Sequence, residues 1–111
     1  MKVLVGFPPT QSPLGTPLLS QNRQFQYFEK PTFLYPVVLG TAATMAKKAG
    51  HDVIWEDAIA QNMGWKEYDE MLERENPDVF LFETKAPVVK KHWKVINHIK
   101  NKFPNIKIVI C

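Results

Sequence analysis

Four short apolar runs, separated by three stretches of helical periodicity, most constrain how this chain can fold. The runs cover residues 2–7, 52–56, 78–83 and 106–111. Between them, apolar residues recur at steps of three and four, which is typical of amphipathic helices. This alternation predicts a parallel sheet joined by right-handed crossovers, with helices on both faces.

The composition of the four runs also predicts the order of the strands. Residues 3–7 and 79–82 are apolar at every position, as expected of strands buried on both faces. Residues 53–55 form a shorter run, and Lys107 interrupts the last one. We therefore expect a three-layer α/β/α, flavodoxin-like parallel sheet with the order 2-1-3-4, in which the first and third strands are central.

The three helical stretches differ in how clearly they define an inward face. The first is expected between about residues 35 and 49, with Gly50 as its stop and Gly40 allowing close packing of helix on sheet. Its predicted inward face is Tyr35, Val38, Ala42, Met45 and Ala49. The second is expected at residues 65–75 after Gly64, with Trp65, Tyr68, Met71 and Leu72 inward and its acidic residues, Asp69 among them, on a solvated face. The third places Val89, Trp93, Ile96, Ile99 and Phe103 inward, with Pro87 in its first turn.

A long segment, residues 8–34, separates the first apolar run from the first predicted helix. Loops of more than about 12–15 residues are uncommon in compact domains and are usually functional or disordered. In doubly wound sheets, ligands bind outside the carboxyl ends of the strands where the strand order reverses. The two loops at that point begin with Phe7-Pro8-Pro9 and with Glu83-Thr84-Lys85, so we expect a ligand there.

Composition excludes several classes of protein. The chain has 111 residues, which is the length of one domain, and its net charge of +3 is too small to indicate nucleic-acid binding. The one cysteine, Cys111, excludes a disulfide framework and is typical of a reducing cytoplasm. No apolar run approaches the length of a membrane span, and the first residues lack the pattern of a signal peptide. We therefore expect a cytoplasmic protein that binds neither nucleic acid nor a membrane.

Common ligand motifs of this kind of sheet are missing from the two loops. Strand 1 lacks the acidic pair of a response regulator, the segment after it is too long for a flavin phosphate loop, and no GxGxxG fingerprint occurs. The histidines His51, His92 and His98 do not have metal-ligand spacing, so we interpret them as structural or solvent-facing. We further expect none of them to lie near the switch point.

Several motifs in order resemble one known family. The sequence contains Val3-Leu4-Val5-Gly6-Phe7-Pro8-Pro9, then Tyr35-Pro36 before a helix rich in small residues, then Lys48-Ala49-Gly50-His51-Asp52-Val53 and Glu56-Asp57-Ala58. Glu75-Asn76-Pro77-Asp78-Val79 and Pro104-Asn105-Ile106-Lys107 precede the third and fourth strands. Nearly the whole chain thus resembles the N-terminal cobalamin (B12)-binding domain of B12-dependent radical SAM enzymes, such as the anaerobic magnesium-protoporphyrin monomethyl ester cyclase group.

The resemblance implies a cofactor and a set of residues that face it. The cofactor is cobalamin, held between this Rossmann-like domain and a radical SAM domain that carries a 4Fe-4S cluster and S-adenosylmethionine. The implied cobalamin-facing residues are Pro8, Pro9, Thr10, Thr84, Lys85 and Ala86. Thr84 is equally well explained as a helix N-cap. With no histidine near the switch point, cobalamin is expected to bind base-off, without a protein nitrogen on the lower face of cobalt.

Two departures from the family lead to further expectations. The family continues past the fourth strand, and the C-x₃-C-x₂-C motif of its iron–sulfur cluster is missing here. We therefore expect a truncated cobalamin-binding domain, not catalytic by itself, whose reading frame continues into the radical SAM domain. The apolar edge at residues 106–111 is expected to pair with a second copy. The alternative function is a ligand-free docking or regulatory domain of the same fold that contacts a radical SAM barrel.

Overall fold

The computed structural model describes residues 1–19 and 26–111, which form an α/β domain built on a four-stranded parallel sheet. The strands are β1 (Lys2–Phe7), β4 (Asp52–Asp57), β5 (Val79–Phe82) and β6 (Lys107–Ile110), and they lie in the order β4-β1-β5-β6. They correspond to the four apolar runs of the sequence. The α/β class, the parallel pairing and the central position of β1 and β5 are confirmed.

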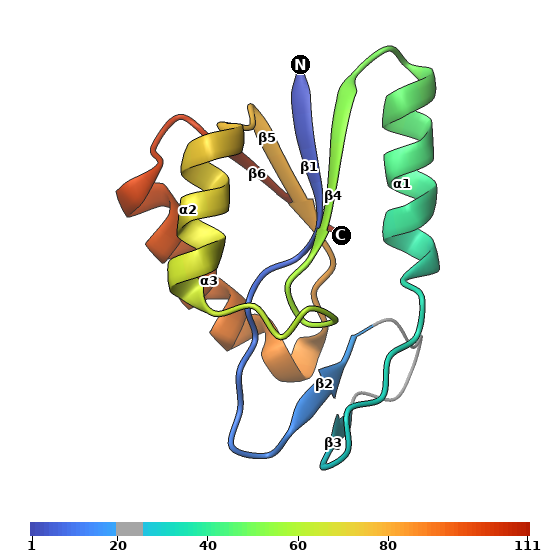
Figure 1. Cartoon of the computed structure of the whole chain (residues 1–111), viewed down its shortest axis with the longest axis vertical. Coiled ribbons are helices and arrows are strands. Elements are labelled where there is room, and N and C mark those ends of the chain that lie inside the picture. The colour runs from blue at the N-terminus through green and yellow to red at the C-terminus, as the bar shows by residue number, and fades with distance from the viewer. Residues whose placement is uncertain (20–25) are drawn as a thin grey trace.

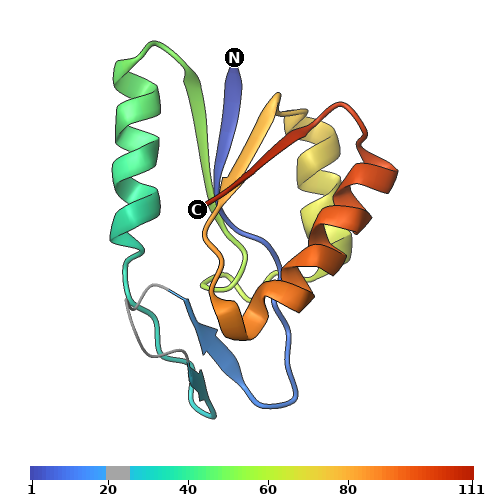
Figure 2. The same ribbon diagram turned by 180° about the vertical axis from the view of Figure 1, so that it is seen from behind.

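Three helices connect these strands and cover the sheet. Helix α1 (Val37–Lys48) lies on one side, and α2 (Trp65–Glu75) and α3 (Val89–Lys102) lie together on the other (Figure 1). A short 3₁₀ turn, η1 (Ala86–Val88), leads into α3 and carries Pro87 near its start, as the sequence predicts. Seen from behind, α3 runs diagonally beside β6 (Figure 2).

Alternate residues of the central strands supply two separate cores. On the side of α2 and α3, Leu4, Phe80 and Phe82 pack with Tyr68, Leu72 and Ile99, all of them fully buried. On the side of α1, the core consists of Val3, Val5, Phe7, Leu19, Leu39 and Val88. Both faces of β1 are therefore buried, which explains why residues 3–7 are apolar throughout.

Helix α2 has the limits and the inward face that its sequence predicts. It follows Gly64 and ends at Asn76, whose left-handed backbone (φ 43°) and N–H bond to the Leu72 carbonyl close the last turn. Tyr68, Met71 and Leu72 are buried. The prediction that Asp69 lies on a solvated face is wrong, because its side chain is buried between α2 and α3.

Helix α1 has a different inward face from the predicted one. Tyr35, Val38 and Met45 are between 49% and 68% exposed, whereas Leu39 is fully buried and Ala43 packs beside it. The interpretation of Gly40 is also wrong: a Cβ there would meet the Tyr35 hydroxyl at 2.3 Å, so this glycine makes room for an aromatic ring and not for the sheet. The Tyr35 ring stacks on Trp55, with ring centroids 5.8 Å apart.

Two neighbouring residues of helix α3 differ in burial from the prediction. Trp93 is 55% exposed, whereas His92 is only 1% exposed. Val95 and Ile99 complete the buried stripe of α3.

The segment 8–34 contains secondary structure that the sequence does not predict. Strands β2 (Thr16–Leu18) and β3 (Gln26–Phe28) pair antiparallel, with Pro17 opposite Tyr27. This hairpin lies beyond the carboxyl ends of the sheet strands (Figure 1). Residues 20–25 of the predicted loop lie outside the described residues.

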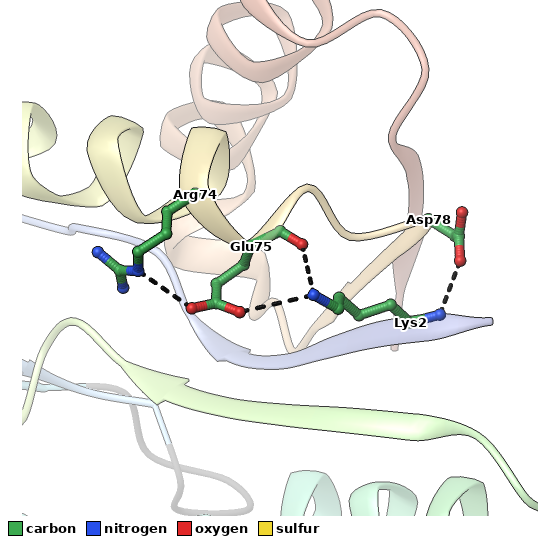
Figure 3. Close-up of polar contacts among 4 residues, drawn as sticks. All are labelled: Lys2, Arg74, Glu75 and Asp78. Carbon is green, nitrogen blue, oxygen red and sulfur yellow. Dashed lines mark hydrogen bonds and ion pairs between the residues drawn. The ribbon is translucent and has the colours of Figure 1, made fainter.

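The opposite end of the sheet is fixed by polar contacts around Lys2 (Figure 3). The Lys2 backbone N–H donates to Asp78 Oδ2 at 2.7 Å, and its Nζ donates to the Glu75 carbonyl at 2.9 Å. Nζ also lies 3.7 Å from Glu75 Oε2. The other oxygen of this carboxylate, Oε1, accepts a hydrogen bond from Arg74 Nε at 3.1 Å. These contacts join the end of α2 to the start of β1.

Candidate functional site

A pocket of about 410 Å³ opens between the turn that follows β1 and the helices α2 and α3. Polar side chains from α3 and from the turn after β1 converge on it. Its wall is formed by the turn after β1, the start of α2 and one face of α3. The lining residues are Pro9, Thr10, Gln11 and Trp65, together with Lys91, His92, Lys94, Val95 and His98.

The wall after β1 depends on a close backbone approach at Gly6. A Cβ at this position would lie 1.7 Å from the Glu56 carbonyl oxygen on β4, and the φ of 155° is also unfavourable for a side chain. Beyond it, Pro8, Pro9 and Thr10 are buried, and the Thr10 hydroxyl donates to the Pro8 carbonyl at 3.0 Å. The two proline rings and this local hydrogen bond hold the turn in one conformation.

His92 forms the polar part of the wall contributed by α3. Its Nδ1 lies 2.7 Å from the Thr84 hydroxyl, and its ring meets Phe82 edge to face, with centroids 5.1 Å apart. Its Nε2 is buried and has no hydrogen-bond partner in the described part of the chain. Burial lowers the pKa of His92 to about 4, so the imidazole is neutral at neutral pH.

A second histidine, His98, lies six residues further along the same helix. Its Nε2 is 2.9 Å from Asp69 Oδ1, and Lys102 Nζ donates to Asp69 Oδ2 at 2.8 Å. Although burial raises the pKa of Asp69, these hydrogen bonds and charges outweigh it and keep that pKa below its usual value. Trp65 lies over the His98 ring, with centroids 4.5 Å apart, so the pair forms a fixed aromatic wall.

The electrostatic character of the pocket is basic. Lys91 and Lys94 line it from α3, and none of its described lining residues carries a carboxylate. Lys91 Nζ also donates to the Tyr27 hydroxyl at 2.7 Å, which connects the β2–β3 hairpin to α3 beside the pocket. An anionic group with an aromatic or apolar body is the ligand chemistry that such a lining favours.

The predicted site residues are only partly brought together. Pro9 and Thr10 line the pocket, and Pro8 is buried behind them. Thr84 is bonded to His92, so its interpretation as a helix N-cap is wrong; Lys85 precedes η1 and no side chain caps that turn. Lys85 pairs with Glu83, and Ala86 is exposed, so neither lines the pocket.

The position of the two α3 histidines corrects the expectation drawn from the sequence. His92 and His98 both line the pocket beside Pro9 and Thr10, so the prediction that no histidine lies near the switch point is wrong. The expectation of a lower cobalt face without a protein nitrogen rested on that prediction and loses its basis. The six-residue spacing between His92 and His98 did not indicate a shared site. Both histidines meet the turn at Pro9 and Thr10, which lies more than 80 residues earlier in the sequence.

A second hollow, of about 380 Å³, lies near Tyr35 and Trp55 on the other side of the sheet. Its wall is largely apolar, and Asp57 is its one acidic lining residue among those described. Burial raises the pKa of Asp57, against hydrogen bonds from the Ala60 and Ile59 N–H groups that lower it. This carboxylate already caps a turn, which leaves the hollow without convergent polar groups.

Neither a cluster of metal ligands nor a membrane-spanning helix was found in the described part of the chain. In residues 1–19 and 26–111, no three His, Cys, Asp or Glu side chains are grouped so that they could hold a metal ion. Across the same residues, every helix is too short or too polar to cross a bilayer. Comparison with models of known protein families, with curated proteins and with solved structures gave no match to this chain.

Proposed function

We propose that this chain is a cobalamin-binding module of a larger B12-dependent radical SAM enzyme, of the methyltransferase or cyclase type. The observation that supports it best is the position of the pocket beside the turn that follows β1. Pro9 and Thr10 of this turn, implied as cobalamin-facing by the sequence resemblance, form part of its wall. This is where a flavodoxin-like three-layer domain, which we propose this sheet to be, holds its ligand.

The pocket and its residues fit part of such a cofactor. A volume of about 410 Å³ is too small to enclose a whole corrinoid, so one arm would enter and the macrocycle would cover the mouth. Lys91 and Lys94 suit the phosphate of a nucleotide arm, and the unpartnered Nε2 of His92 suits a polar group on it. Pro8, Thr84, Lys85 and Ala86 do not line the pocket, and in our proposal they contact the cofactor outside it.

The roles of the chain's own residues follow from this arrangement. Bound cobalamin supplies the cobalt chemistry, and in our proposal a downstream radical SAM domain with its 4Fe-4S cluster and S-adenosylmethionine acts on the substrate. The Pro8-Pro9-Thr10 turn is held by its internal hydrogen bond and excludes water from one wall. Lys94 attracts the anionic group, and Trp65 limits the width of the pocket.

Titration with hydroxocobalamin, followed by absorbance and by retention of colour after gel filtration, tests the proposal. We expect binding of one equivalent, weakened by Lys94→Glu because this substitution reverses a charge on the pocket wall. Lys90→Glu is the matched control, since Lys90 lies on the same helix, is exposed and does not line the pocket. Absence of binding, or equal loss in both variants, would contradict the proposal.

One observation favours the alternative, a ligand-free docking domain that contacts a radical SAM barrel. Five apolar side chains in and just before α1 are between 49% and 68% exposed: Phe33, Tyr35, Val37, Val38 and Met45. Trp55, whose ring stacks on Tyr35, adds to the same apolar surface. Exposed apolar patches of this kind mark contacts with other proteins. Specific co-purification of this chain with the separately expressed barrel, in the absence of cobalamin binding, would favour the docking function.

A further inference from the structure

The Thr84–His92 pair is a polar arrangement beside the buried ring of Phe82. His92 is 1% exposed, its Nδ1 is held by Thr84, and its Nε2 has no partner in the described chain. A buried polar group without a hydrogen bond is destabilising. Such a group on the wall of a pocket is accounted for if it bonds to something that enters the pocket.

The hydrogen bond to Thr84 favours one tautomer of the neutral ring. The Nδ1–Oγ1 separation of 2.7 Å fits a Thr84 hydroxyl that donates to the ring nitrogen, and our proposal takes the bond in this direction. The proton of the imidazole then lies on Nε2, which becomes a hydrogen-bond donor. Thr84 is in this way a positioning residue that acts through His92.

The other walls restrict the body of the ligand. The Trp65 ring is held against His98, which is itself bonded to Asp69, so an aromatic face is fixed at the start of α2. Pro9 and Val95 add apolar surface, and Lys91 and Lys94 supply positive charge. A planar ring with an acceptor atom and an attached anion matches these walls together.

We propose that the pocket selects a nucleotide-like ligand, a planar heteroaromatic ring that carries a phosphate, and that His92 determines this specificity by donating a hydrogen bond from Nε2. The inference uses the same pocket as the proposed function but does not require cobalamin. Adenosine monophosphate, adenosine and ribose 5-phosphate are suitable probes, because they separate the ring from the phosphate.

Calorimetric titration of the full chain with these three probes tests the inference. We expect adenosine monophosphate to bind, and each of the other two to bind about tenfold or more weakly, since each lacks one of the two recognised groups. His92→Phe is expected to weaken binding by about tenfold, whereas His92→Gln, which keeps a donor near the Nε2 position, is expected to retain most of it. Equal binding by His92→Phe and the unmodified chain, or no binding of adenosine monophosphate, would overturn the inference.

The role of Thr84 is tested by the tautomer of His92. Nitrogen-15 chemical shifts of the ring are expected to show the proton on Nε2 in the unmodified chain and in Thr84→Ser, and a mixture of tautomers in Thr84→Val. A proton on Nδ1 in the unmodified chain would overturn the assignment. These results are separable from the proposed function: hydroxocobalamin binding without nucleotide binding removes only the inference, and nucleotide binding without hydroxocobalamin binding removes only the proposed function.

Discussion

Lys91 and Tyr27, 64 residues apart in the sequence, are joined twice. Lys91 Nζ donates to the Tyr27 hydroxyl at 2.7 Å and lies 4.8 Å from the centroid of the same ring. The β2–β3 hairpin is thereby connected to the helix that lines the pocket. Because Lys91 also lines the pocket, the hairpin influences where one of its positive charges lies.

Tyr27→Phe is expected to remove the hydrogen bond and keep the contact between cation and ring. Because the pair is exposed, the loss in free energy of unfolding should be small, about 0.5–1 kcal/mol in urea denaturation. Tyr27→Leu, which removes both interactions, is the control and should cost more. Equal effects of the two substitutions would show that the hydroxyl contributes nothing.

The pKa of His92 predicts a specific dependence of stability on pH. Burial lowers this pKa to about 4, below the unfolded value of about 6.5, so the unfolded chain binds the extra proton between these two values. Stability is therefore full above about pH 6.5 and falls as the pH drops toward 4, by up to about 3 kcal/mol. Chemical denaturation at intervals between pH 4 and pH 7 measures the slope.

His92→Gln provides the comparison, because it cannot titrate in this range. Glu56 and Asp57 have pKa values raised by burial and contribute with the opposite sign, so the difference between the two proteins isolates the histidine. Asp69, whose pKa is lowered on balance, adds a loss only below about pH 4. Parallel profiles for the two proteins would contradict the prediction.

Gly6→Ala is expected to be severely destabilising. The new Cβ would meet the Glu56 carbonyl oxygen at 1.7 Å, and a backbone atom hydrogen-bonded within the sheet cannot move aside cheaply. We expect a loss of about 3 kcal/mol or more, or failure to fold. Gly64→Ala is the matched control: no atom lies within 4 Å of its Cβ position, and its φ of −84° suits alanine, so thermal unfolding should change little.

The observed rotation of α1 can be tested by two truncations to alanine. Leu39→Ala is expected to cost about 2–5 kcal/mol, because Leu39 is fully buried against the sheet. Val38→Ala, its neighbour at 49% exposure, should change the free energy of unfolding by less than about 0.5 kcal/mol. The reverse ranking would support the face predicted from the sequence.

Self-association through β6 remains a prediction. This strand is at one edge of the described sheet, and Val109 and Ile110 are 43% and 36% exposed. Unprotected apolar edges pair with other strands, so light scattering should show concentration-dependent oligomers. Val109→Lys is expected to suppress them, and Val38→Lys, on α1 and outside β6, is the control. A monomer at high concentration would contradict the prediction.

The sequence predicted elements well where only one interpretation of a pattern was possible. The apolar residues of α2 form a single stripe, so both its limits and its buried apolar residues were predicted correctly, although the buried Asp69 was not. Helix α1 carries apolar residues on several sides, and periodicity cannot tell the stripe that contains Leu39 from the one that contains Val38. The strands of the β2–β3 hairpin have three residues each, which is too short for an alternating pattern to be recognised.

The position of the candidate site could be predicted in part from the sequence, but the full set of residues that line it could not. The carboxyl ends of β1 and β5 and the turn at Pro9 and Thr10 follow from the order of elements. The contribution of His92 does not, because its burial depends on the rotation of α3 and on a hydroxyl eight residues away. Side chains that meet only in the folded chain leave no pattern in the sequence.

The contacts around Lys2 imply that the two ends of the sheet open at different rates. At the amino end, the backbone of β1 and the last turn of α2 share hydrogen bonds through one lysine (Figure 3). At the carboxyl end, the chain leaves the strands to form the walls of a hollow. Amide protons near Lys2 should therefore exchange with solvent more slowly than those around Thr84, and a bound ligand should slow exchange mainly at the second end.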